Sequence, residues 1–110
     1  SGEVYDAASV GELLGLDEET TRMLAGEILN SLDYDLKELI ETISDMESLE
    51  AIKEAAHKIK GSAANLRFDA IQKSCYAIEL AAREGQTDAD YNTMLSEVFE
   101  AVELSRQMKI

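Results

Sequence analysis

Hydrophobic residues recur along the chain at intervals of three and four positions, the spacing of one face of an α-helix. The pattern predicts five helices, over residues 4–14, about 17–45, about 48–66, 69–85 and about 87–108. The expected loops are short, so the four longer helices should be antiparallel neighbours. The sequence therefore predicts an all-α fold, an antiparallel four-helix bundle with a short extra N-terminal helix. A length of 110 residues suits one domain, and we assign residues 1–110 to it.

Short polar side chains mark the expected helix starts. Asp17 and Ser48 precede apolar-periodic segments and are predicted N-caps, because their side-chain oxygens can accept a backbone N–H of the first turn. Asp69 is predicted to cap the fourth helix in the same way. Thr87 or Asp88 is predicted to cap the last.

The third predicted helix holds the only histidine of the chain, His57. Its apolar stripe consists of Ile52, Ala55, Ala56, Ile59, Ala63 and Leu66, and His57 points nearly the opposite way. The helical neighbours of His57 are Lys53, Lys60, Gly61 and Ala64. The helix thus presents an imidazole to solvent beside a cation and residues with almost no side chain. Such a surface suits the docking of a group that must approach the ring closely.

The motif His57-x-x-Lys60-Gly61 in an Ala-rich amphipathic helix resembles the histidine-containing phosphotransfer (HPt) domain of two-component phosphorelays. The segment 75–85, which reads CYAIELAAREG, is similar to the helix that follows the histidine helix in that family. The resemblance extends from about Val10 onward. The short motif alone recurs by chance, so the combination with helical register and the downstream helix carries the resemblance.

The resemblance implies a role for each residue of this face. His57 would accept the phosphoryl group, since the neutral form of histidine is well populated near pH 7. Lys60 would pair with phosphoryl oxygens. Glu79, on the next helix, would accept the Nδ1 hydrogen of His57 and leave Nε2 as the nucleophile. Two alternatives stay open, namely a solvent-facing Glu79 paired with Arg83, and Gln72 as the histidine's partner.

Three further positions are assigned to partner docking: Lys53, Gly61 and Ala64. A mid-helix glycine costs roughly 1 kcal/mol relative to alanine, so Gly61 needs a reason. We expect that reason to be clearance for the phosphoryl group or the partner, because position 61 lies away from the apolar stripe. Close helix packing is the alternative.

The sequence departs from the family pattern at Arg67. The resemblance implies a glycine there, ten residues after the histidine, at a left-handed helix end. Because arginine is strained in that conformation, we expect the helix to run on or to close differently. Arginine in place of glycine at position 67 therefore leaves open the geometry of the loop after the histidine helix and of the docking surface that this loop helps to form.

Charge narrows the choice of partners. The net charge of −13 argues against nucleic acid and anionic membranes. Between Lys53 and Lys73, however, five basic residues face two acidic ones, a local excess of +3 around the histidine. One histidine and one cysteine on different helices offer too few ligands for a metal, and no cofactor is expected. A single cysteine and the lack of an evident secretory signal favour a cytoplasmic protein.

These observations predict a monomeric phosphorelay intermediate. It would take a phosphoryl group from one receiver-domain aspartate and pass it to another response-regulator receiver, which would supply Mg²⁺. A hybrid sensor histidine kinase is a further possible partner, and the chain is compatible with being a free-standing protein or part of such a kinase. Two alternatives stay open: the phosphoacceptor domain of a chemotaxis-type histidine kinase, and a helical interaction module that is not phosphorylated.

Overall fold

The structure is a computed structural model that describes residues 4–45 and 48–108. Within these ranges it contains five α-helices and no strand: α1 (Ala7–Leu14), α2 (Glu18–Ser44), α3 (Leu49–Ala64), α4 (Asp69–Arg83) and α5 (Tyr91–Arg106). The predicted all-α bundle with a short N-terminal helix is confirmed.

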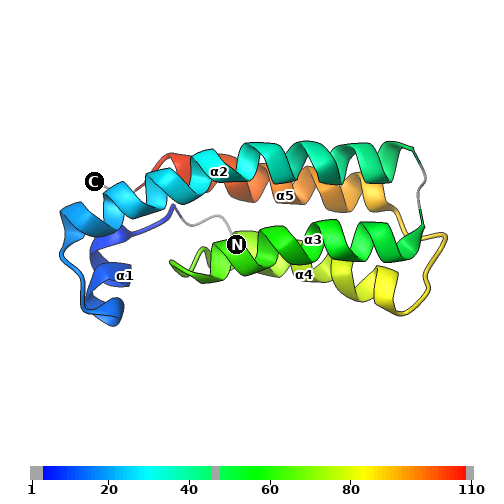
Figure 1. Cartoon of the computed structure of the whole chain (residues 1–110). Helices are drawn as coiled ribbons and strands as arrows, with labels where there is room; N and C mark the ends of the chain where they lie inside the picture. The colour runs from blue at the N-terminus through cyan, green and yellow to red at the C-terminus, as the bar shows by residue number, and fades with distance from the viewer. Residues whose placement is uncertain (1–3, 46–47, 109–110) are drawn as a thin grey trace.

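The four long helices form two layers, with α2 beside α5 and α3 beside α4 (Figure 1). The most extensive helix contact is that between α3 and α4, and α1 packs against α2 at one end of the bundle. The resulting body is elongated, with extents of 43 × 23 × 20 Å. The α3–α4 pair therefore forms one layer of the bundle, and α2 and α5 form the other.

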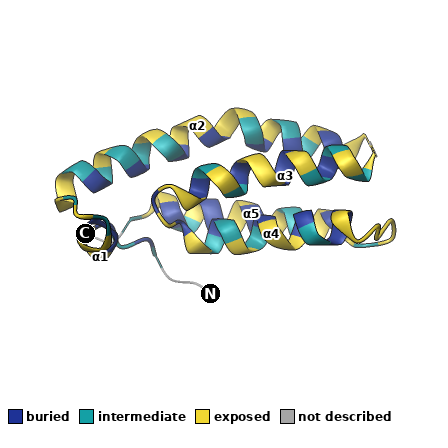
Figure 2. Ribbon diagram, turned by 60° about the horizontal axis from the view of Figure 1, so that its bottom comes forward, coloured by how far each residue is buried: buried dark blue, intermediate teal, exposed yellow. Residues whose placement is uncertain are grey.

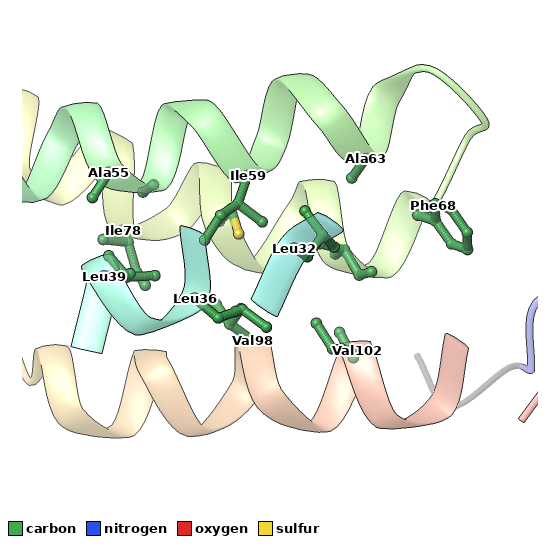
Figure 3. Packing of buried hydrophobic residues seen from close by; sticks show 14 of the residues in the cluster. Leu32, Leu36, Leu39, Ala55, Ile59, Ala63, Phe68, Ile78, Val98 and Val102 are labelled. Carbon is green, nitrogen blue, oxygen red and sulfur yellow. The ribbon is translucent and has the colours of Figure 1, made fainter. Parts of the chain in front are cut away.

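The apolar stripe of α3 lies in the core, as its spacing predicts. All six of its residues are buried: Ile52, Ala55, Ala56, Ile59, Ala63 and Leu66. Figure 3 shows Ile59 of α3 and Ile78 of α4 among the side chains between the helices, with Leu36 of α2 and Val98 of α5. Buried and exposed residues alternate along each helix with helical periodicity (Figure 2).

Two apolar residues that the spacing places on inner faces lie at the surface instead. Met23 of α2 and Phe99 of α5 are both exposed. In the first half of α2 the fully buried positions are Thr21, Ala25 and Leu29, so the buried stripe is rotated by one residue from the pattern of large side chains. Here α1 packs against α2, and its Gly11 lies so close to Thr21 that a β-carbon on residue 11 would meet the Thr21 hydroxyl at 2.6 Å.

Local capping explains where two of the helices start. Asp17 accepts the backbone N–H of Thr20 at 2.7 Å, and Ser48 caps α3 in the same way through Ala51. These two predicted caps are confirmed.

Two other predicted caps are wrong. The N-cap of α4 is Phe68, and Asp69 is the first helical residue and makes no capping hydrogen bond. The N-cap of α5 is Asp90 rather than Thr87 or Asp88. In both cases the chain leaves a tight turn before the helix starts, and the turn moves the boundary.

The first helix starts three residues later than its apolar pattern suggests, because Tyr5 is used elsewhere. The Tyr5 ring stacks on Phe68, with centroids 4.1 Å apart, and its hydroxyl donates to the Leu66 carbonyl oxygen at 2.8 Å. Asp6 then caps α1. The segment before α1 thus fastens the turn between α3 and α4.

That turn contains the departure at Arg67. The backbone of Arg67 is left-handed, with φ 58°, although it is not a glycine. The Phe68 N–H donates to the Ala63 carbonyl at 3.0 Å and the Arg67 N–H to the Ala64 carbonyl at 3.2 Å, the two bonds of a Schellman motif. The expectation that the helix runs on or closes differently is therefore wrong. Two backbone hydrogen bonds and the buried Phe68 hold arginine in a conformation that suits glycine.

Arg67→Gly should stabilise the fold slightly. Relief of the left-handed strain, about 1–2 kcal/mol, exceeds the added entropy of the unfolded chain, about 0.4–1 kcal/mol. We expect a gain of up to about 1 kcal/mol in the free energy of unfolding, measured by urea denaturation. Gly85→Ala is the matched control, because Gly85 (φ 75°) ends α4 in the same conformation and a β-carbon there would meet open space. It should lose about 1 kcal/mol. A less stable Arg67→Gly variant would show that the arginine side chain stabilises the fold.

Candidate functional site

His57 projects from the outer face of α3. Its neighbours Ala56 and Ile59 are completely buried, whereas the His57 side chain is 63% exposed. The opposite orientation follows from helical periodicity, as the sequence predicts. The imidazole is therefore accessible to another molecule.

Glu79 of α4 lies against the histidine. Its Oε2 is 3.0 Å from Nδ1 of His57, and its side chain is only 5% exposed. An ionised carboxylate only accepts hydrogen bonds, so in the neutral ring Nδ1 carries the hydrogen and Nε2 carries the lone pair. The pairing expected for Glu79 is thus present in the structure. Gln72, the alternative partner, instead contacts Asp69 at 3.3 Å.

Two cations share the same carboxylate. Lys60 Nζ lies 2.7 Å from Oε1 of Glu79, and Arg83 Nη2 lies 2.8 Å from Oε2. The Lys60 ammonium also stands over the ring of Tyr76, 5.1 Å from its centroid. The sequence offers the pairing of Glu79 with Arg83 as an alternative to its pairing with His57. The structure contains both pairings, so Arg83 joins the site, but Glu79 is buried and the expectation that it faces solvent in that alternative is wrong.

The cations decide the charge state of Glu79. Burial alone would raise the pKa of the Glu79 carboxyl, but the hydrogen bonds and charges of Lys60 and His57 outweigh it and bring the pKa below its ordinary value of 4.5. Glu79 is therefore ionised near neutral pH. The site contains an anion that both orients the imidazole and holds two cations.

A shallow hollow of about 370 Å³ opens beside the ring. Its lining consists of Lys53, Glu54, His57, Lys58, Glu79 and Arg83. Lys53 pairs with Glu50 at 3.1 Å, and Lys58 pairs with Glu38 of α2 at 2.9 Å. The hollow lies towards the start of α3, whereas Lys60 and Tyr76 lie towards its end. Cations therefore stand on both sides of the histidine.

The surface next to His57 carries little side chain. Gly61 and Ala64 are both exposed, and a β-carbon placed on Gly61 would meet no other atom within 4 Å. Helix packing among the described residues does not require glycine there. The alternative explanation of Gly61, close packing against a neighbouring helix, is wrong.

Cys75 belongs to the core and not to the site. It is completely buried on the inner face of α4, as the spacing predicts. Burial, together with the nearby charge of Glu79, raises the pKa of its thiol to about 12. Its thiolate form is therefore negligible at neutral pH.

An antiparallel helical bundle that presents one oriented, exposed histidine next to a lysine defines a class of protein that can carry a group on an imidazole. The family model described as Hpt domain matches residues 12–107. The chain therefore belongs to the Hpt domain family, whose members transfer phosphoryl groups through a histidine in two-component signalling and are carriers rather than kinases. They interact with response-regulator receiver domains and histidine kinases. No curated protein and no solved structure matches the sequence. Over residues 4–45 and 48–108, none of the helices combines the length and apolar character that crossing a membrane requires.

Glu79→Gln should destabilise the bundle in a pH-dependent way. Lys60 and Arg83 lose their counter-charge, and we expect a loss of about 1–3 kcal/mol in the free energy of unfolding at pH 7. Because the folded pKa of Glu79 is lowered, its stabilising contribution is present above the ordinary value of 4.5 and disappears as the pH falls through the folded value. The difference between wild type and variant, measured by urea denaturation, should therefore shrink on acidification. Glu103→Gln on the exposed face of α5 should make little difference at any pH. A difference for Glu79→Gln that stays constant down to pH 2 would contradict the assignment.

Proposed function

We propose that the protein is a phosphorelay intermediate. It accepts a phosphoryl group on His57 from an aspartyl phosphate of one receiver domain and passes it to the aspartate of another. The observation that carries the proposal is the contact of 3.0 Å between Glu79 Oε2 and His57 Nδ1 beneath an exposed ring. That contact leaves Nε2 as the nucleophile that such a transfer needs.

The transfer step follows from this arrangement. The Nε2 lone pair attacks phosphorus, the N–P bond forms, and the bond from phosphorus to the receiver's carboxylate oxygen breaks. The receiver's aspartate leaves as a carboxylate, and the Nδ1 hydrogen stays between the ring and Glu79. The phosphorylated ring is then a cation, which the buried Glu79 carboxylate stabilises. Transfer to the next receiver reverses each of these changes.

The surface around His57 suits a brief encounter with an acidic partner. Lys53 lines the hollow on one side of the ring, and Gly61 and Ala64 leave room on the other. In this proposal the receiver supplies Mg²⁺ and the acidic pocket, and the basic surroundings of His57 steer docking. We propose that the protein works as a cytoplasmic monomer.

A labelling experiment tests the relay. A receiver that carries ³²P on its aspartate is mixed with the protein and Mg²⁺, and the protein is then separated and tested for acid and alkali stability of its label. Label that is labile to acid and stable to alkali is expected, as for phosphohistidine. A protein that stays unlabelled, or one whose label survives acid, would overturn the proposal.

The second candidate is the phosphoacceptor domain of a chemotaxis-type histidine kinase. The carboxylate on Nδ1 of His57 is compatible with this role as well. The same assay separates the two candidates when a parallel sample receives an ATP-binding kinase domain and labelled ATP instead of the receiver. Rapid labelling in the kinase sample with none from any receiver would favour the second candidate.

Lys60→Ala should slow phosphoryl transfer without unfolding the bundle. A charge-assisted hydrogen bond to the phosphoryl group contributes about 1.5–3 kcal/mol, so we expect the transfer rate to fall by about tenfold to a hundredfold. Single-turnover transfer from a phosphorylated receiver measures the change. Lys58→Ala is the matched control, because Lys58 pairs with Glu38 of α2. An unchanged rate in Lys60→Ala would remove the role given to this lysine.

A further inference from the structure

The cluster around Glu79 contains more positive charge than one carboxylate neutralises. Lys60 and Arg83 each contact Glu79, at 2.7 and 2.8 Å, while a neutral His57 adds only a hydrogen bond. Glu79 is almost completely buried, so it needs a cationic partner at all times. It does not need two. One of the two cations can therefore leave without stranding a buried charge.

The geometry indicates which cation leaves. Lys60 contacts Oε1, whereas His57 and Arg83 share Oε2. Departure of Lys60 thus leaves the hydrogen bond that orients the imidazole unchanged. It removes the one contact that the buried Oε1 has among the described residues, so Arg83 on Oε2 has to hold the charge of the carboxylate. Lys60 also lies on the helix of His57, one turn along, and its flexible stem allows the ammonium to move. Arg83 lies on the helix of Glu79, one turn after it, so helical geometry keeps it within reach of the carboxylate.

We propose that Arg83 is a positioning residue: it holds the Glu79 carboxylate when Lys60 leaves Glu79 for the incoming phosphoryl group, while His57 is still neutral and before the N–P bond makes the ring a cation. The inference rests on the proposed function, because it concerns the approach of a phosphoryl group to a neutral His57. It assigns to Arg83 no contact with the phosphoryl group. Arg83 acts through Glu79 alone, because its charge lowers the free-energy cost of moving Lys60 away from Glu79.

Phosphoramidate provides a test that requires no protein partner. Its N–P bond breaks as the Nε2–P bond forms, and the amine takes a proton from water and leaves as ammonia. The loading rate of the full chain is measured for wild type, Arg83→Gln, Glu79→Gln and the double variant. Arg83→Gln should slow loading by about tenfold when residue 79 is glutamate, and by less than about twofold when it is glutamine. Equal slowing in both backgrounds would show that Arg83 acts directly, and no slowing in either would show that it does not act; each result overturns the proposal.

The Lys60 ammonium provides a second readout, which a merely structural role of Arg83 would not change. Its ¹⁵N resonance should shift on loading in wild type. The shift should be much smaller in Arg83→Gln, because Arg83 no longer contacts Glu79 and Lys60 is held there instead. Arg83→Lys should restore part of the loading rate, because it retains the charge. A Lys60 resonance that stays unchanged in loaded wild type would overturn the inference.

The two proposals fail in different ways. Normal loading by phosphoramidate with no label from any receiver would overturn the relay and leave the inference about Arg83 testable. A protein that takes no phosphoryl group from either donor would overturn both.

Discussion

Replacing His57 with glutamine should abolish phosphoryl uptake and leave the fold intact. The chain has no other histidine, so no second imidazole can accept the group. The side chain is 63% exposed and glutamine has good helix propensity, so we expect a change in unfolding free energy of less than about 1 kcal/mol. The glutamine amide can still donate to Glu79, but it has no nucleophilic nitrogen. Transfer of label from a phosphorylated receiver measures the loss, and circular dichroism verifies the helical content.

The matched control is Lys58→Gln, which places the same side chain one position further along α3. Lys58 points towards Glu38 of α2, and its replacement should leave uptake within about twofold of wild type. Acid-labile label on the His57→Gln protein would contradict the assignment of His57 as acceptor. Loss of label together with loss of helical content would be attributed to unfolding, and His57→Asn would then be compared at lower temperature.

Phe68→Ala should produce the largest loss of stability. Phe68 is 1% exposed, it heads the residues with the largest fully buried side chains, and Tyr5 stacks on it at 4.1 Å. Removing a buried phenylalanine costs about 3–5 kcal/mol through lost burial and the cavity that remains. Since domains of this kind are stable by about 5–15 kcal/mol, the variant should be close to unfolding at 37 °C. Urea denaturation at 15 °C is the measurement.

The chain offers its other phenylalanine as the control. Phe99 is 40% exposed on α5, and Phe99→Ala should cost less than about 1 kcal/mol. Similar losses for the two variants would show that the stack of Tyr5 on Phe68 is not the anchor of the turn. Phe68→Leu should recover most of the stability, because it keeps most of the buried volume.

The parts of the fold that were predicted from sequence are those that depend on nearby residues. The inner stripe of α3 and the caps Asp17 and Ser48 follow from periodicity and from hydrogen bonds to residues three positions away. The start of α1 was predicted too early because Tyr5 packs on Phe68, far along the chain. No local pattern contains that contact. The cap of α4 differs from the prediction for a related reason, since the Schellman turn makes Phe68 the last residue before the helix and Asp69 its first.

Some features of the site can also be predicted from the sequence, and others cannot. The outward direction of His57 follows from helical periodicity. Antiparallel packing allows Glu79 to lie opposite it, and the family resemblance is what favours Glu79 over Gln72. The position of Lys60 does not follow from the sequence, because its spacing from His57 suggests an ammonium that is free to meet a ligand. In the structure it is bound to Glu79 and lies over Tyr76. The i+4 spacing of Arg83 from Glu79 was visible in the sequence, but only the burial of Glu79 shows why two cations gather there.

The pairing of His57 with Glu79 also constrains how such a chain can evolve. Glu79 lies 22 residues after His57, and the stretch between them includes the end of α3, the Schellman turn and most of α4. A one-residue insertion or deletion within either helical part would rotate everything beyond it by about 100° and move the ring and the carboxylate apart, although both helices would still form. Substitutions in this stretch can accumulate one by one, whereas changes in its length cannot. A distant homologue that retains this chemistry should therefore be easier to find by the distance between its histidine and its acidic residue than by the amino acids in between.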